Sequence, residues 1–499
     1  MQSRSQLSRL PHSSLGWPAV PSLLVYTLVT KQVYTWQEQA DRQGNHRSIS
    51  NDSGRGYEGG SPMKKVALVG SALALCLIVT CALFPDSSEA PTGFDGQTNG
   101  LIDQKTHTAD QEKFDEVEQI SDGLGPLYNA QSCRECHQSP ASGGVSQMSE
   151  LRVGHRGPSG QFESPIIPIA HGKTVITGRT LVNDRAICPS RAFSNVELQE
   201  RVPDTETIQT TRMAVNLLGD GFVEAVPDQE LLDLAATQCR RSHRRICGQT
   251  IYVPILEAPG HTAIGRFGWK DQQASLLSFA GDAYLNEMGI TNKLFPDEVT
   301  ALCNTAPEPN DKPGTDGLED IDRFARFVRA TKAPPRDLAL ADTTEAQTGS
   351  RVFDKIGCST CHVGTLTTAP AGTETDGGAF KVPDALGSKT FHPYSDFLLH
   401  DVGTGDGIAI AMQEHFGAAS TRRTWQNLSY KSFQDAANKV RTAPLWGMRT
   451  HSRLMHDGMS LTLTNAILRH EKEAHEVTEK FRRLKPKEKS ALLAFLNSL

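Results

Sequence analysis

Two short motifs of the same form constrain this chain most strongly. Each consists of two cysteines separated by two residues and followed at once by a histidine. They are Cys133, Cys136 and His137, and then Cys358, Cys361 and His362. In both motifs an aromatic residue stands five positions before the first cysteine, and the offset between the motifs is 225 residues. This repetition indicates a duplicated module.

The pattern Cys-x-x-Cys-His is the attachment signature of c-type haem. The two thiols add across the haem vinyl groups, and the adjacent histidine binds the iron from one side. We therefore expect two covalently bound c-type haems, with His137 and His362 as iron ligands.

Two other interpretations compete with haem. The four motif cysteines are also a ligand set for one zinc ion. Only 16 of the 499 residues are histidine, so chance seldom places one directly after both cysteine pairs, and this favours haem. A thioredoxin-like redox pair requires a βαβ pattern, which the surrounding sequence lacks.

The N-terminal region has the features of an export segment. Residues 1–62 show short apolar islands without a sustained period, and we expect a spurious extension before a true start at Met63; the alternative is a cytoplasmic tail. Residues 63–90 read as a signal peptide, with a basic start, an apolar run over 66–84 and small residues after it. That run is also long enough for an inner-membrane anchor. The expected location is periplasmic, secreted, or anchored on the outer side of the inner membrane, where disulfides persist.

Helical patterns dominate the remaining chain. They cover residues 111–120, 276–288, 318–331, 343–356, 462–481 and 486–498, whereas strand patterns are confined to short pieces such as 174–176 and 221–226. Long loops rich in Gly, Pro and Thr, notably 363–395, are typical of a chain that wraps a bound group. We expect a mainly α fold with long loops and minor β, made of two cytochrome c-like haem domains over 91–340 and 341–499.

The net charge and the remaining four cysteines further restrict the possible partners and the covalent structure. The net charge of −6 argues against nucleic acid as a partner. The four cysteines Cys188, Cys239, Cys247 and Cys303 predict two disulfides in one of three connectivities. Residues 240–246 form a basic loop between two of them. It would suit docking of an acidic electron donor, although a solvated surface loop is the commoner case.

The sequence resembles the bacterial di-haem cytochrome c peroxidase superfamily, and most closely its branch of di-haem oxidoreductases, also called thiol oxidoreductases. The resemblance extends over most of 115–499 and rests on the order and spacing of several short segments. These are 122–130 (DGLGPLYNA), 219–228 (GDGFVEAVPD), 265–270 (GRFGWK), 287–291 (EMGIT), 393–402 (PYSDFLLHDV), 441–447 (RTAPLWG) and 456–458 (HDG).

This resemblance implies a division of labour between the haems. The N-terminal haem would react with peroxide, and the C-terminal haem would supply it with electrons past Trp269. Glu287 would move a proton between the peroxide oxygens, which suits a carboxylate whose pKa is raised by burial. The alternatives are core packing for Trp269 and a solvated helix end for Glu287. The glutamine that the superfamily often has about ten residues earlier is missing, since residues 277–279 read LSF.

The resemblance also suggests iron ligands. The peroxidases place a methionine ligand 14 positions after the histidine of the HDG segment, and here that position is His470. Ala466, Ile467 and Ala474 would share one helical face with it, so we expect His362 and His470 to bind the C-terminal iron, with a buried, hydrogen-bonded His470 as the alternative. Imidazole in place of a thioether lowers the haem potential. His456 would lie near this haem or in a turn.

Two questions stay open at this stage. The sixth ligand of the N-terminal haem is undetermined, with Met148, His155 and His171 downstream of its motif. Relatives hold calcium between the haems, but residues 450–453 (THSR) depart from the expected pattern, so calcium is an open cofactor.

The sequence thus predicts an exported di-haem c-type cytochrome oxidoreductase of peroxidase type, with hydrogen peroxide as substrate. Its electron donor would be a small redox protein, either a cytochrome or a cupredoxin. The alternative is a non-catalytic electron-transfer di-haem cytochrome. The spacing of the four other cysteines gives no support to thiol oxidation.

Overall fold

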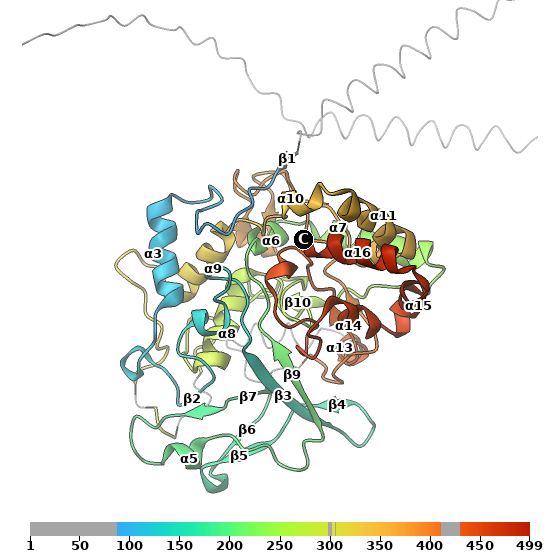
Figure 1. Cartoon of the computed structure of the whole chain (residues 1–499). Coiled ribbons are helices and arrows are strands. Elements are labelled where there is room, and N and C mark those ends of the chain that lie inside the picture. Colours follow the sequence, from blue (N-terminus) through green and yellow to red (C-terminus); the bar gives the residue numbers. More distant parts are fainter. Residues whose placement is uncertain (1–86, 298–301, 305, 411–429) are drawn as a thin grey trace, which may run out of the picture. The chain divides into compact units, whose positions relative to one another are not determined.

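The computed structural model describes residues 87–297, 302–304, 306–410 and 430–499 (Figure 1). The contacts divide the chain after Cys81, and Ala82–Leu499 form one compact unit. The predictions for residues 1–62, and for most of 63–90, lie outside the described residues. Ser88–Glu89 (β1) already pair in parallel with β15 (Lys389–Phe391). None of the helices described is long and apolar enough to cross a membrane.

Four predicted helices are confirmed with close agreement. They are α8 (Leu276–Met288), α9 (Asp320–Ala330), α11 (Thr344–Ile356) and α16 (Pro486–Asn497). Capping explains their bounds: the Ser275 side chain accepts a hydrogen bond at the start of α8, and Gly289 ends that helix with φ +72°. Proline stands in the first turn of α16, where its missing N–H has no intrahelical partner to lose.

Three predictions are wrong in position or type. The helix predicted over 111–120 is α3 (Gln104–Asp115), which the Asp103 side chain caps. The strand predicted over 221–226 lies mostly in α6 (Asp220–Glu224). The single helix predicted over 462–481 is broken into α14 (Leu463–Leu468) and α15 (His475–Arg483), because the Glu471 N–H bonds to the carbonyl of Val402.

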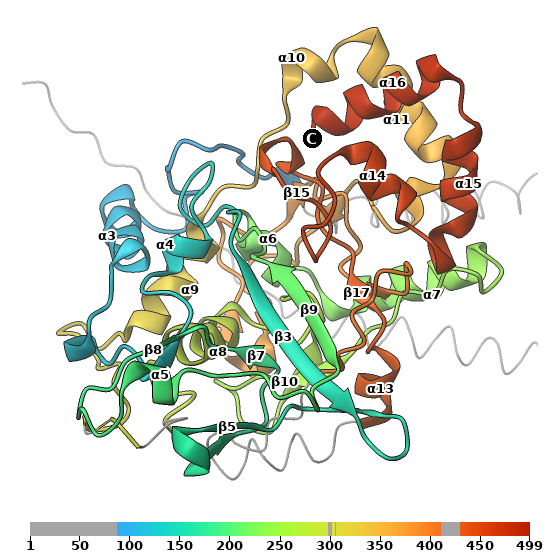
Figure 2. The same ribbon diagram turned by 60° about the horizontal axis from the view of Figure 1, so that its bottom comes forward.

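The β structure is larger than predicted. Strand β3 (Ser149–Arg156) pairs antiparallel with β9 (Ile208–Met213), in register from Ser149 opposite Met213 to Gly154 opposite Ile208. Strands β4 (Phe162–Glu163) and β7 (Leu181–Val182) complete this sheet, and β3 and β9 run side by side in Figure 2. Polar and apolar residues alternate poorly along β3, which explains why its sequence gave no strand signal. The predicted mainly α fold class is therefore only loosely supported.

The other elements are short, except for α7, which has 14 residues. The helices are α4 (Cys133–Cys136), α5 (Asn195–Leu198), α7 (Asp228–Arg241), α10 (Leu338–Ala341) and α13 (Tyr430–Asp435). The strands are β2 (Leu127–Tyr128), β5 (Ile167–Ile169), β6 (Thr174–Ile176), β8 (Arg185–Ala186), β10 (Tyr252–Pro254), β11 (Thr262–Ile264), β12 (Leu366–Thr367), β13 (Glu374–Thr375), β14 (Phe380–Lys381), β16 (Leu399–His400) and β17 (Val440–Arg441). Strand β6 confirms the prediction over 174–176.

Separate hydrophobic clusters support the two cysteine motifs. Cys133 packs against the largest cluster, to which α6, α8 and α9 contribute. Cys358 packs against another cluster, which forms between α11 and α16. The two predicted disulfides are present, and their pairing is Cys188–Cys303 and Cys239–Cys247.

Candidate active site

The first motif opens into a cavity of about 430 Å³. Cys133 and Cys136 lie on α4, which the Ser132 side chain caps, and both line this cavity together with His137. The His137 Nδ1 lies 3.3 Å from the carbonyl of Gly144, which leaves Nε2 as the nitrogen available to a metal. Burial lowers the pKa of His137 to about 4, so the ring is neutral at pH 7, as a metal ligand must be.

The second motif lines a separate cavity of about 230 Å³. Cys358, Cys361, His362 and His470 all contribute to its wall. Nδ1 of His362 lies 3.0 Å from the carbonyl of Tyr394, and Nδ1 of His470 lies 2.7 Å from that of Ala466. Burial lowers the pKa of both rings, that of His362 to about 4. Two neutral imidazoles thus line one cavity, and neither Nε2 has a hydrogen-bond partner within the described ranges of the chain.

His470 lines this cavity although its predicted helical setting is wrong. It follows α14, which ends at Leu468, and its N–H bonds to the carbonyl of Ile467. His456 lines the same cavity, is 2% exposed, and has a buried Nδ1 without a hydrogen-bond partner among the described residues.

The donor groups of both cavities fit haem better than zinc. The two thiol pairs line different cavities, whereas a structural zinc site needs four ligands around one ion. All four motif cysteines are free of disulfides. Arg179 lines the first cavity with a buried Nε that has no hydrogen-bond partner in the described part of the chain. The rest of its guanidinium pairs with the buried Glu200 and donates to the carbonyl of Leu181, so this Nε–H is the group that would suit an acceptor such as a haem propionate.

Trp269 lines both cavities, together with Met213, Ala214 and Val215. Its ring packs edge-on against His456 at a centroid distance of 6.0 Å. This location, between the two cavities, is the one that the resemblance implies for the tryptophan.

A buried cation anchors the residue after the tryptophan. The Lys270 ammonium lies 2.9 Å from Oδ1 of Asp406 and donates to the carbonyls of Ala437 and Lys439, at 2.9 and 2.6 Å. Arg212 also pairs with Asp406, at 2.8 Å. Because these groups are almost fully buried, their mutual pairing offsets the loss of water and fixes the backbone beside Trp269.

Glu287 lines the first cavity from the last turn of α8. Its Oε2 accepts a hydrogen bond of 3.1 Å from the Asn129 amide, and its backbone carbonyl accepts one of 2.6 Å from the Asn129 N–H. Burial, reinforced by the charge of Glu150, raises the pKa of Glu287 well above its usual range. The side chain is therefore not a solvated helix end.

The sequence analysis missed Glu150 and Arg152, which line the same cavity from β3. Their spacing of two puts both on one face of a strand, and Arg152 Nε donates to Glu150 Oε1 at 2.7 Å. A Glu-x-Arg pair would have been the signal, but it required β3 to be recognised as a strand.

The three candidates for a sixth ligand have different surroundings. Met148 lines the first cavity. His155 Nδ1 lies 2.8 Å from Oε2 of Glu206, and the exposed His171 has Nε2 2.8 Å from Oε1 of Glu197. Neither histidine is among the residues that line the first cavity.

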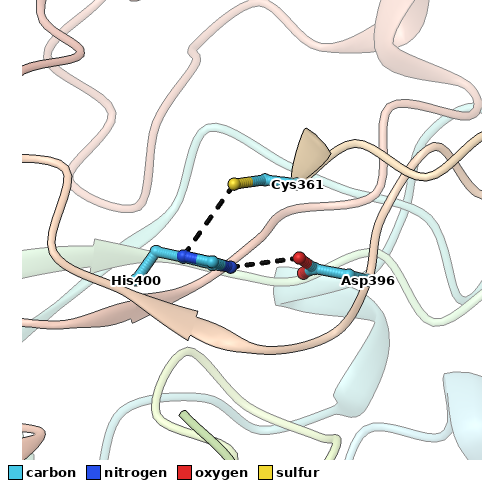
Figure 3. Close-up of side chains that lie close together, drawn as sticks. All are labelled: Cys361, Asp396 and His400. Atoms are coloured by element: carbon cyan, nitrogen blue, oxygen red, sulfur yellow. Dashed lines mark hydrogen bonds and ion pairs between the residues drawn. The ribbon is translucent and has the colours of Figure 1, made fainter. Parts of the chain in front are cut away.

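His400 connects the second motif to two carboxylates, as Figure 3 shows in part. Its Nδ1 lies 3.8 Å from Cys361 Sγ and 2.9 Å from Glu473 Oε2, and its Nε2 lies 3.0 Å from Asp396 Oδ2. Ligand atoms of Cys361, Asp396 and His400 lie within 4.8 Å of one another. A haem thioether at Cys361 would remove the thiolate from this set. Calcium prefers oxygen ligands, so the group does not suit calcium, which stays a prediction.

Residues from both sides of position 340 line each cavity. Ala409 and Ile410 contribute to the first, and Met213 and Ile246 contribute to the second. Each cavity is therefore lined by residues from both of the predicted haem domains.

Among the solved structures that match the chain, two resemble it distantly. Hydrazine synthase of Kuenenia stuttgartiensis, pressurised with xenon, is 14% identical, with a TM-score of 0.34 over 91% of this chain and 100% of that one. A MauG-like protein associated with microbial copper homeostasis is 15% identical, with a TM-score of 0.34 over 84% of this chain and 94% of its own. A search of the curated proteins found no match.

A family model gives the assignment. Residues 187–499, more than half of the chain, match the family described as "Di-haem oxidoreductase, putative peroxidase". The match includes the second motif, Trp269, Glu287 and His470. The chain therefore belongs to the di-haem oxidoreductase family.

Proposed function

We propose that this chain is an exported di-haem c-type cytochrome that reduces hydrogen peroxide at its N-terminal haem with electrons from its C-terminal haem. The observation that carries the proposal is the difference between the two cavities. Among the described residues, His137 is the one histidine that lines the first cavity, where Glu287 also lies. Five histidines line the second cavity, and two of them, His362 and His470, hold Nδ1 against a backbone carbonyl.

The residues of the first cavity would divide the work. Cys133 and Cys136 hold the haem and His137 binds its iron, which when present supplies the redox chemistry that cleaves the O–O bond. Glu287 is held by Asn129 at 3.1 Å, and its raised pKa favours the protonated form. It can therefore act as the general acid for the departing oxygen.

The residues of the second cavity would store an electron. Cys358 and Cys361 would hold this haem, and His362 and His470 would offer imidazoles to its iron, which would favour a lower potential than a methionine ligand. Electrons would cross past Trp269, whose side chain lines both cavities.

The alternative function is a non-catalytic electron carrier. Met148 favours it, because this side chain lines the first cavity and offers a thioether. Electron paramagnetic resonance of the oxidised holoprotein separates the two functions. If the protein is a peroxidase, we expect one low-spin and one high-spin haem. Two low-spin signals that persist after reduction and peroxide addition would indicate a non-catalytic electron carrier.

We also propose a small acidic redox protein, a cytochrome or a cupredoxin, as electron donor. The basic segment 240–246 supports this, although its first two residues belong to the last turn of α7 and not to a loop. Ile246 lines the second cavity, while Arg240, Arg241 and Arg244 are exposed. These three arginines have no carboxylate within 4.0 Å in the described part of the chain. Opposite charge on a partner would speed its encounter with this surface.

Export is part of the same proposal. Two disulfides and covalent haem attachment favour an oxidising compartment outside the cytoplasm. Mass spectrometry of the purified chain would identify its first residue and show whether the segment before residue 90 is retained.

A further inference from the structure

Two carboxylates from distant parts of the chain meet in the first cavity. Glu150 comes from β3 and Glu287 from the last turn of α8, and both line the cavity wall. They lie close enough for the charge of Glu150 to be, after burial, the strongest influence on Glu287. Two negative charges in one buried place repel each other, which favours one proton on the pair.

The neighbours determine which carboxylate is protonated. Burial favours the neutral acid at Glu150, but Arg152, 2.7 Å away, together with Glu287 and Arg212 outweighs burial and lowers the pKa of Glu150. Among the described residues the Asn129 amide donates a hydrogen bond to Glu287, and burial together with the Glu150 charge raises the pKa of Glu287. The surroundings therefore favour the ionised form of Glu150 and the protonated form of Glu287.

Other charged groups face this pair from the surrounding elements. Arg212 lies on β9 and acts on Glu150. Asp282 lies on α8, and burial raises its pKa to about 6. Arg152 stabilises the ionised form of all three carboxylates. Its effect is largest on Glu150, because Glu150 is its direct partner.

We propose that Glu150 and Glu287 work as a one-proton pair in which Glu150 is the positioning residue that keeps Glu287 protonated. The inference rests on the proposed peroxide reduction. As the O–O bond breaks, Glu287 gives its proton to the departing oxygen, which leaves as water. The pair takes up the proton that the other oxygen loses, and so returns to its one-proton state. Two electrons from the donor protein and two protons from solvent then convert that oxygen to water.

The test uses the holoprotein with Glu150→Gln. Infrared spectroscopy of the resting oxidised protein detects the C=O stretch of a protonated carboxyl, which is assigned to Glu287 by its loss in Glu287→Gln. Removing the Glu150 charge leaves Arg152 beside Glu287, so this band should be absent at neutral pH and return only in acid. The pH profile of peroxide-driven haem oxidation should move in the same direction, with a rate about tenfold lower at neutral pH.

Matched variants separate this role from a structural one. Glu150→Asp keeps the charge and should restore the band and the pH profile. Glu163→Gln changes a carboxylate on β4 of the same sheet, outside the cavity lining, and should change neither. The inference is overturned if wild type lacks the Glu287 band, or if Glu150→Gln leaves band and profile in place. A different outcome is that peroxide does not oxidise the wild-type haems at any pH, while the infrared band changes in Glu150→Gln as expected. The proposed function would then be wrong, and the inference about the carboxylate pair would be supported.

Discussion

The indole N–H of Trp269 donates a hydrogen bond of 2.7 Å to the backbone carbonyl of Met213, and both residues line both cavities. The Met213 N–H bonds in turn to the carbonyl of His456, whose ring packs against the indole. The side chain between the cavities is thus held from two directions. A rigid aromatic group in this place is suited to carry electrons between two bound haems.

Trp269→Phe should slow electron transfer between the haems about tenfold, because it removes the indole and its hydrogen bond while keeping an aromatic ring. Stopped-flow absorbance after peroxide addition would resolve oxidation of the C-terminal haem. Trp446→Phe is the control, since Trp446 is buried but lines neither cavity. Equal rates of electron transfer between the haems in the two variants would show that Trp269 is not on the electron-transfer path.

His470→Met should raise the midpoint potential of the C-terminal haem, because a thioether replaces an imidazole as iron ligand. A spectroelectrochemical titration measures this shift, and the low-spin signal should change its position in the paramagnetic resonance spectrum. His475→Met, at an exposed histidine paired with Glu471, should leave both unchanged. An unaltered potential in His470→Met would mean that His470 is a packing residue.

Exchange of Arg240, Arg241 and Arg244 for glutamate should slow reduction of the protein by an acidic donor about tenfold and weaken the dependence of that rate on salt. The rate is measured with a reduced acidic cytochrome at several ionic strengths. The same exchange at Lys105, Lys312 and Lys431, which are exposed and do not line the second cavity, is the control. If both sets of variants slow reduction equally, only net charge matters.

Glu118→Gln should stabilise the protein in a pH-dependent way. Glu118 is 2% exposed, its Oε1 accepts a hydrogen bond of 3.1 Å from the Tyr284 hydroxyl, and burial raises its pKa from 4.5 to about 7. The folded state thus holds this proton more firmly than the unfolded state, and stability falls as the pH rises through both values. Above about pH 7 the ionised carboxylate costs about 1–3 kcal/mol.

Thermal unfolding of the Glu118→Gln holoprotein should therefore show a higher midpoint than wild type at about pH 8 and no gain at about pH 4. Glutamine keeps an oxygen acceptor for Tyr284. Glu116→Gln, at an exposed neighbour, should show no such pH dependence. A gain that is the same at both pH values would point to packing instead of ionisation.

Much of the fold and of the site could be predicted from local sequence patterns. The haem motifs are contiguous, α8 and α16 have clear caps, and His470 could be placed by its spacing from His456. The meeting of Glu150 with Glu287 could not be predicted, because β3 lacks clean alternation and the contact joins residues far apart in the chain. The break before α15 depends on a hydrogen bond to Val402, and the disulfide pairing depends equally on the folded chain.

The most direct test of the account is an anaerobic titration of the fully reduced holoprotein with hydrogen peroxide, followed by haem absorbance. Peroxide takes up two electrons on reduction to water, and the two ferrous haems supply one each. We predict that one equivalent of peroxide per chain oxidises both haems, and that the Glu287→Gln variant does so far more slowly. Haems that stay reduced in the presence of peroxide would contradict the account.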